Sequence, residues 1–448
     1  MNYIALTIGP IYDTIFDTLN GDNKTKKLKA GSYYFSFFMK TLLKNIKDDF
    51  DILVPYVDGE ALSKEYKNMG LFHDRFIAQS EKSEKEIRDI FKQKEDMTFK
   101  ELAICIQDES IFDELKKNMT NHLLVASSEN LKKIDKNIIF AINKILDSKE
   151  LQREFSLIAE TNWIKKYQEN ELKKSSVKTI EDLSSKLGFD YYAVITADGD
   201  KIGAKIENEA TEENPQDIKN LSEKLYNFFT KDSDIYTITN KDFKGELIYA
   251  GGDDILAFIP VKQENKTFLD YIKVLDERFK QIVGEDVSLS FGINIAYYKY
   301  PLRDAIKSAF NLLYESKSDS KIKNRVSIKI TKHSGQWFKS TLCLNEERYS
   351  LYKELTDNIL ENNITLPHSL HHTLKRYEEA ILSTYRQDNR SSIKPLFDTV
   401  FNDSKGSDKS GIEFVQKYLD VVSPQKNKDF DTIFSELSII KFLREDRK

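Results

Sequence analysis

A regular succession of hydrophobic patterns in residues 190–331 constrains the fold of this chain more than any other feature. One segment is a continuous apolar run, typical of a strand buried on both faces, and another alternates strictly between large apolar and small or polar residues. Two further apolar runs flank Gly251-Gly252-Asp253-Asp254, which is a hairpin signal. Apolar residues at helical spacing separate these runs. The predicted strands are residues 191–197, 246–250, 255–260 and 287–297, and the predicted helices are residues 221–229 and 268–282.

The order of these elements is β-α-β-β-α-β, which is the order of the ferredoxin-like fold with its antiparallel sheet. A further helix over residues 302–313 and an alternating strand over residues 325–331 follow them. The pattern therefore predicts an α+β protein in which residues 186–334 form one domain.

The rest of the chain divides into three predicted regions. Residues 1–80 read as a small α/β unit, and we expect the remainder of that unit within residues 100–150. Residues 81–185 read as a helical insertion or connector, and residues 335–448 as a C-terminal helical bundle. The first region has strands at 3–8 and 52–57 and a helix at 33–46, and the bundle helices are 350–360, 371–385, 412–422 and 429–444.

A polar segment in the first region, residues 20–32, predicts a lysine-rich loop. Lys24, Lys26, Lys27 and Lys29 lie within six positions of it. This loop is a candidate for contact with the phosphate of a nucleotide or RNA, and the alternative is an ordinary solvated loop.

Composition excludes several classes of protein. Among 448 residues there are 68 Lys and Arg against 73 Asp and Glu, so a net charge of −5 provides no global attraction for nucleic acid or an anionic membrane. The two cysteines, Cys105 and Cys343, cannot form a four-cysteine zinc site or a disulfide framework. No apolar run approaches the roughly 18 residues that span a bilayer. We expect a cytoplasmic protein without a membrane partner.

Acidic residues follow two strands that the ferredoxin-like order places side by side. Asp198-Gly199-Asp200 comes directly after the first strand, and Asp253-Asp254 lies in the hairpin. Carboxylates that face one another repel, and a divalent cation relieves that repulsion. Mg²⁺ in particular binds a few carboxylates together with waters and substrate phosphates. The alternative to a metal site is that Gly251-Gly252-Asp253-Asp254 forms only a favourable hairpin turn, with both aspartates in water.

Several motifs, taken in order, resemble the large polymerase-like subunit of type III CRISPR effector complexes. The resemblance is to the second palm domain of that subunit and, near the N-terminus, to the opening of its Cmr-subtype member. The palm motifs are YAVITADGD (192–200), LIYAGGDDILA (247–257), AYYKYP (296–301), KNRVSI (323–328) and KHSG (332–335), and the N-terminal motifs are IALTIGP (4–10), KAGSY (29–33) and DRFIA (74–78).

The resemblance implies two ferredoxin-like palm domains, of which only the second is catalytic. It implies that Asp198 and Asp253 hold Mg²⁺ or Mn²⁺, and that Asp254 is a second ligand or helps to activate an attacking ribose hydroxyl. Asp200 is a weaker candidate, because strand alternation turns its side chain outward.

A lysine that meets the triphosphate follows the fourth-strand helix in GGDEF-type cyclases, which share this palm. Lys317 is at the matching position, and Lys299 is a second option. The expected nucleotide-binding residues are therefore Gly199, Asp200, Gly251, Gly252, Lys299 and Lys317.

The implied function is a nucleotidyltransferase that converts ATP to a cyclic oligoadenylate when its complex binds target RNA. The implied partners are the other subunits of a Cmr-type complex, crRNA, target RNA and ATP. Many relatives begin with an HD nuclease domain, whereas the only His-Asp pair here is His73-Asp74, so we expect no DNase activity. The alternatives are a catalytically idle scaffold subunit, and a palm enzyme that joins AMP to another acceptor such as S-adenosylmethionine.

Overall fold

The computed structural model describes residues 1–9, 24–58, 62, 72, 74–106, 116, 120–148, 177–209, 215–230, 235–264, 266–319, 321–361, 363–366, 370–387, 390–401 and 409–445. These residues divide into two compact units. Unit 1 contains Met1–Thr179, Gly199–Ala257 and Arg278–Val287, and unit 2 contains Ile180–Asp198, Phe258–Glu277 and Ser288–Lys448. Within the described ranges, no helix combines the length and the apolar character needed to cross a membrane.

Unit 1 contains a complete ferredoxin-like element order. Its four strands are arranged β2-β3-β1-β4, and β1 pairs antiparallel with both β3 and β4. This sheet order, with one helix after β1 and another after β3, is that of the β-α-β-β-α-β fold. The elements are β1 (Asn2–Gly9), α2 (Lys24–Ile46), β2 (Asp51–Val54), β3 (Arg75–Ser80), α4 (Glu84–Ile106) and β4 (Thr120–Ser127).

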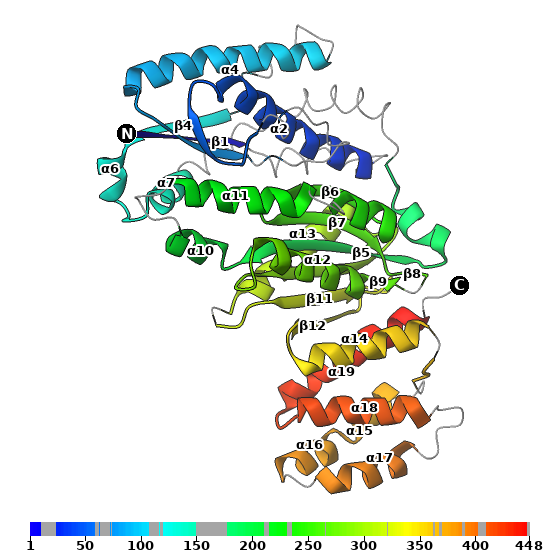
Figure 1. The fold of residues 1–448 in the computed structure, drawn as a ribbon. Coiled ribbons are helices and arrows are strands. Elements are labelled where there is room, and N and C mark those ends of the chain that lie inside the picture. Colours follow the sequence, from blue (N-terminus) through cyan, green and yellow to red (C-terminus); the bar gives the residue numbers. More distant parts are fainter. Residues whose placement is uncertain are drawn as a thin grey trace. The chain divides into compact units, whose positions relative to one another are not determined.

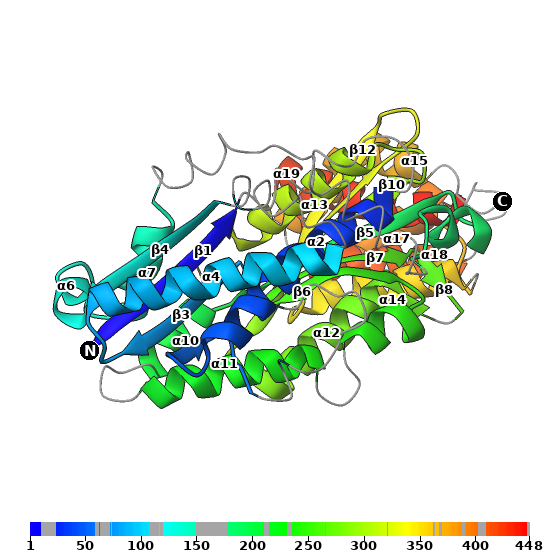
Figure 2. The ribbon, with the colours of Figure 1, turned by 90° about the horizontal axis from the view of Figure 1, so that it is seen from above.

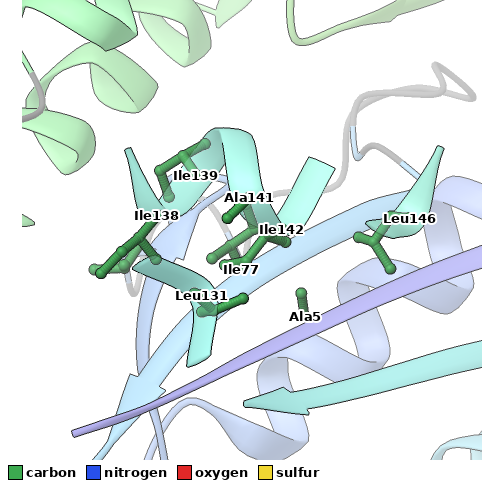
Figure 3. Packing of buried hydrophobic residues seen from close by; sticks show 9 residues of the cluster. Ala5, Ile77, Leu131, Ile138, Ile139, Ala141, Ile142 and Leu146 are labelled. Atoms are coloured by element: carbon green, nitrogen blue, oxygen red, sulfur yellow. The ribbon is translucent and has the colours of Figure 1, made fainter. Parts of the chain in front are cut away.

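Helices cover both faces of this sheet. On one face, Phe76 of β3 contacts Phe91 of α4, and Phe38 of α2 contacts Phe99 of α4, with ring centroids 6.4 and 5.2 Å apart; Figure 2 shows α4 lying across the strands. On the other face, α6 (Ser128–Lys132) and α7 (Ile138–Leu146) bury an aliphatic cluster against the sheet. Figure 3 shows its residues, which include Ala5, Ile77, Leu131, Ile138, Ile139, Ala141, Ile142 and Leu146.

Two expectations for this region differ from the structure. The four lysines of the predicted loop lie in a helix, because α2 begins at Lys24, and residues 20–23 of that segment lie outside the described residues. The fourth strand of the first palm is Thr120–Ser127, which lies within the residues where its remainder was expected and inside the predicted connector. Its pairing with β1 makes this strand part of the first sheet rather than of a helical insertion.

The second sheet has six strands in the order β12-β11-β10-β5-β7-β6. Its strands β10-β5-β7-β6, with helices between β5 and β6 and between β7 and β10, reproduce the ferredoxin-like order predicted from the hydrophobic pattern. The elements are β5 (Tyr191–Asp200), α10 (Ile202–Glu209), α11 (Pro215–Thr230), β6 (Glu246–Gly251), β7 (Asp254–Pro260), α12 (Phe268–Val283), β10 (Ser288–Tyr297), α13 (Leu302–Lys317), β11 (Arg325–Thr331) and β12 (Trp337–Cys343).

Strand β12 was not predicted, and it extends the sheet beyond the expected start of the C-terminal bundle. It pairs antiparallel with β11, which itself pairs parallel with β10. The fold class and the two ferredoxin-like domains are therefore confirmed, whereas the exact domain boundaries stay a prediction.

The C-terminal part of unit 2 is helical, and Figure 1 shows its helices stacked in successive layers. Glu436 of α19 is fully buried and joins three elements, because it accepts hydrogen bonds from Ser340 of β12, Arg348 of α14 and Tyr418 of α18. The helices are α14 (Glu347–Leu360), α15 (Leu370–Arg376), α16 (Glu378–Arg386), α17 (Ile393–Phe401), α18 (Lys409–Val422) and α19 (Asn427–Glu445).

Candidate active site

The end of β5 carries the first of the predicted acids. The strand is buried on both faces from Tyr191 to Ala197, and at Asp198 the side chain becomes 30% exposed. Asp200 is fully buried, so the expectation that strand alternation turns it outward is wrong. Alternation leads to solvent only where one face of a sheet is open, and β5 is covered on both faces at this point.

The second pair of acids lies in a two-residue hairpin turn, as predicted. Strand β6 ends at Gly251, Gly252 and Asp253 form the turn, and β7 begins at Asp254. Gly252 has a φ of +67°, a conformation that glycine adopts without strain. The side chain of Asp253 is partly buried, and that of Asp254 is exposed. The turn therefore presents one partly buried and one exposed carboxylate.

The hairpin and the end of β5 touch at Gly199. A Cβ atom on Gly199 would lie only 2.8 Å from Oδ2 of Asp253 and 2.9 Å from its Cβ. Real Cβ atoms do not approach heavy atoms so closely, so only glycine leaves room for the Asp253 carboxylate here. Asp198, the other predicted metal ligand, is the residue bonded to the N-terminal side of Gly199.

Lys317 forms an ion pair with Asp198, and their side chains are 26% and 30% exposed. Lys317 is the last residue of α13, and the position of that helix depends on Gly292 of β10. A Cβ on Gly292 would lie 2.2 Å from the carbonyl oxygen of Ala309, so the helix backbone rests directly on the strand. This close packing brings the end of α13, and the Lys317 ammonium, to the end of β5.

Negative charge accumulates around the hairpin. Burial raises the pKa of Tyr249, on β6, well above its usual value, and the carboxylates of Asp254, Asp74 and Asp253 raise that pKa further. Asp74, which precedes β3, thus contributes to the electrostatic field at the hairpin. Its motif was recognised in the sequence, but no role was predicted for it, because no local pattern connects it to β6.

Lys299 does not lie with the acids. The backbone N–H of Tyr298 donates to the carbonyl of Asp190, 2.9 Å away, so this loop adjoins the beginning of β5. The eight residue steps from Asp190 to Asp198 span about 26 Å of extended strand. Lys299 instead lies over the ring of Tyr298, with its Nζ 5.2 Å from the ring centroid. The structure thus places Lys299 away from the acids, and its contact with the nucleotide stays a prediction.

The residues that the structure describes contain no group of three His, Cys, Asp or Glu side chains arranged to hold a metal ion. The three-aspartate ligand set expected from the resemblance is thus not assembled as a complete protein cage. Asp198 and Asp253 offer only hard oxygen donors, and both are partly accessible. Such a sparse set fits Mg²⁺ or Mn²⁺ of the kind whose coordination is completed by water and substrate phosphate.

Comparison with known proteins identifies the domain that carries this site. The family described as Cas10/Cmr2, second palm domain, matches residues 191–327. Residues 191–327 therefore resemble a Cas10/Cmr2 second palm domain. The matched range contains β5, the acidic hairpin and α13, and hence every predicted site residue.

Relatives of the Cas10/Cmr2 palm extend the match in sequence and in fold. The CRISPR system Cmr subunit Cmr2 of Pyrococcus furiosus is 29% identical over an alignment of 194 positions, which covers 38% of this chain and 22% of that protein. The apo Type III-B Cmr-beta complex contains a chain with a TM-score of 0.55 at 12% identity, covering 85% of this chain and 75% of that one. The Csm1–Csm4 cassette with cA4 gives a TM-score of 0.54 at 13% identity, covering 99% and 69%. The predicted resemblance to the type III large subunit is confirmed, and at these low identities the structures show a shared fold.

Proposed function

We propose that this chain is a metal-dependent nucleotidyltransferase that joins ATP units into a cyclic oligoadenylate within a type III CRISPR effector complex. Solved structures of the same fold include Csm1–Csm4 cassettes in complex with one ATP, with pppApA and with cA4. These ligands form the series of substrate, linear intermediate and cyclic product that such a reaction requires.

The observation that carries this proposal is the pair of contacts made by two consecutive residues of β5. Asp198 is paired with the Lys317 ammonium, and Gly199 lies against the Asp253 carboxylate. One of these consecutive residues thus contacts a cation of α13, and the next contacts a carboxylate of the hairpin. Phosphoryl transfer depends mainly on such positioning of charge around a polyphosphate.

The reaction we propose is attack of a ribose 3′-hydroxyl on the α-phosphate of ATP, with pyrophosphate leaving. Asp198 and Asp253 would hold Mg²⁺ or Mn²⁺, which when bound lowers the pKa of the attacking hydroxyl and neutralises charge on the leaving group. Asp254, which is exposed at the start of β7, would accept the hydroxyl proton or add a ligand.

The remaining residues of the site would bind the substrate. Lys317 is a phosphate ligand in this scheme, exchanging its bond to Asp198 for one to the triphosphate. Gly251 and Gly252 lack side chains where the polyphosphate would approach the backbone, and Gly199 leaves room for the Asp253 carboxylate beside it.

The proposed partners follow from the relatives. One solved structure of this fold is the Type III-B Cmr-beta complex bound to cognate target RNA. We infer that this chain likewise works among other Cmr-type subunits, with crRNA, and responds to target RNA.

The test is the mass of the product formed from labelled ATP when the tagged complex, isolated from its host, meets matching target RNA with Mg²⁺ or Mn²⁺. A series of cyclic adenylates is the expected result. A conjugate of AMP with another molecule would support nucleotidyl transfer from ATP, but to a different acceptor. Absence of any product with either metal, after RNA binding has been verified, would favour a scaffold subunit and overturn the proposal.

A further inference from the structure

A buried ion pair joins helix α2 to the strand that leads into the acidic hairpin. Lys29 Nζ donates to Oε1 of Glu246, the first residue of β6, and the two side chains are only 5% and 2% exposed. The Lys29 ammonium also lies 5.6 Å from the ring centroid of Tyr236. Two opposite charges are thus removed from water at the beginning of β6.

Further hydrogen bonds hold the same end of β6. The second carboxylate oxygen of Glu246 accepts from the backbone N–H of Lys178 at 3.1 Å, and Lys178 Nζ donates to the carbonyl of Gly245 at 2.9 Å. Asn240, within a short π-helical turn, accepts from the N–H of Leu247 at 3.0 Å. Three separate segments of unit 1 therefore converge on the start of this strand.

Stability alone does not account for this arrangement. Burying two charges carries a desolvation cost, and apolar side chains of similar volume are often as stabilising as a buried ion pair. What a buried, hydrogen-bonded pair adds is direction, because its bonds are satisfied in only a narrow range of geometries. The pair therefore favours one position of β6 along helix α2.

At its other end, β6 leads into the hairpin turn, where a small displacement of the strand would disturb the packing of Asp253. The strand runs from Glu246 to Gly251, and the turn that follows sets Asp253 against Gly199 with no room for a methyl group between them. A slip of one residue would turn every side chain of the strand to the opposite face. Smaller shifts of the strand would move the Asp253 carboxylate directly.

We propose that Lys29 and Glu246 are positioning residues for the acidic hairpin. Their ion pair fixes β6 on helix α2 of the first palm, and thereby fixes the location of Asp253. The catalytic part of this inference rests on the proposed function. It also gives the first palm, which lacks a Gly-Gly-Asp-Asp motif, a defined part in the site.

The test replaces the pair by apolar side chains of similar length, in the double variant Lys29→Met with Glu246→Met. Assembled complexes are compared for the kcat and KM of ATP conversion, and the full chain is compared for thermal unfolding and for hydrogen exchange of the amides of residues 247–254. We expect similar unfolding temperatures, a kcat that falls about 10- to 100-fold, a KM within about threefold, and hairpin exchange that is about tenfold faster.

The matched control is Lys94→Met with Asp49→Met, which removes a more exposed ion pair of the same unit, with an N–O distance of 3.0 Å. It should change neither kcat nor hairpin exchange. If the first double variant fails to fold, Lys29→Gln with Glu246→Gln replaces it with the same expected direction. A folded variant with wild-type kcat and wild-type exchange would overturn the proposal. If the wild-type complex makes no product, the proposed function fails, and the exchange data alone still decide whether the pair orders the hairpin.

Discussion

Gly199 is the residue on which the geometry of the site depends most directly. A methyl group there would come within 2.8 Å of Asp253 Oδ2 and of Ile202 Cγ1, so the carboxylate would have to move. Misplacement of a reacting group by about 1 Å can cost on the order of 100-fold in rate. We therefore expect Gly199→Ala to lower the rate of product formation about 100-fold, measured with radiolabelled ATP in the assembled complex.

Gly203 provides the matched control for that substitution. It lies in α10, and the nearest atom to a Cβ at this position is Cε1 of Phe140 at 3.8 Å, an ordinary contact. Gly203→Ala should keep activity within about twofold and stabilise the helix by roughly 0.5–1 kcal/mol. Equal activity of the two alanine variants would contradict the proposed role of Gly199.

Lys317 should contribute to substrate binding through its charge. Loss of a charged hydrogen bond to phosphate costs about 1.5–3 kcal/mol, so Lys317→Met should lower kcat/KM for ATP at least tenfold. The control is Lys339→Met, because Lys339 pairs with Glu315 of the same helix α13 and both side chains are more exposed. A drop of the same size in both variants would indicate a general effect on α13 rather than phosphate binding.

Sequence predicted the part of the candidate site whose backbone structure is local. The turn at Gly252 and the acids beside it follow from hairpin rules, and the structure places them as expected. The burial of Lys29 and of Asp200 was not predictable. The polar sequence around Lys29 gives no sign that this lysine is buried in an ion pair with Glu246, which is 217 positions away.

Helices and strands with a strong hydrophobic periodicity were predicted accurately, whereas those with a weak periodicity were not. Strand β10 and helix α12 were predicted to within a residue or so, because their apolar residues alternate with period 2 and recur at helical spacing. Strand β12 has no such alternation, and its conformation depends on pairing with β11. Helix α2 starts earlier than predicted because its first turns are polar, and tertiary contacts stabilise them.

The packing of α15 on α19 should depend on pH. His371 packs edge-on against Phe434, with ring centroids 5.0 Å apart. Burial, with repulsion from Lys441, Lys332 and His372, lowers the pKa of His371 to about 4 from its ordinary 6.5. Between these values the unfolded chain binds more protons than the folded one, so stability falls as the pH falls from about 6.5 to about 4.

We expect this effect to be on the order of 2 kcal/mol, because partial exposure screens the charge. Thermal unfolding of wild type and His371→Leu at pH 7 and pH 4.5 measures it, and the variant should lose less stability on acidification. The exposed neighbour His372, changed to Gln, serves as the control. An equal loss of stability in wild type and His371→Leu would exclude this group as the cause.

At the scale of the whole molecule, two β-α-β-β-α-β sheets define the chain. The second was predicted from pattern alone, whereas the first was predicted only in part, because its fourth strand follows a long helix and was read as part of a connector. A single sequence also contains no signal for the subunits and RNA that the proposed function requires. Those partners come from similarity to relatives, and activity of the assembled complex is what tests them.

The most direct test of the account is the double variant Asp253→Ala with Asp254→Ala, assembled into the complex and supplied with ATP, Mg²⁺ and target RNA. Both side chains lie at a partly or fully exposed turn, so the variant should fold and bind RNA like wild type. We predict that it forms no detectable oligoadenylate, whereas the wild-type complex does. Unchanged product yield from an intact variant complex would contradict the assignment of catalysis to this hairpin.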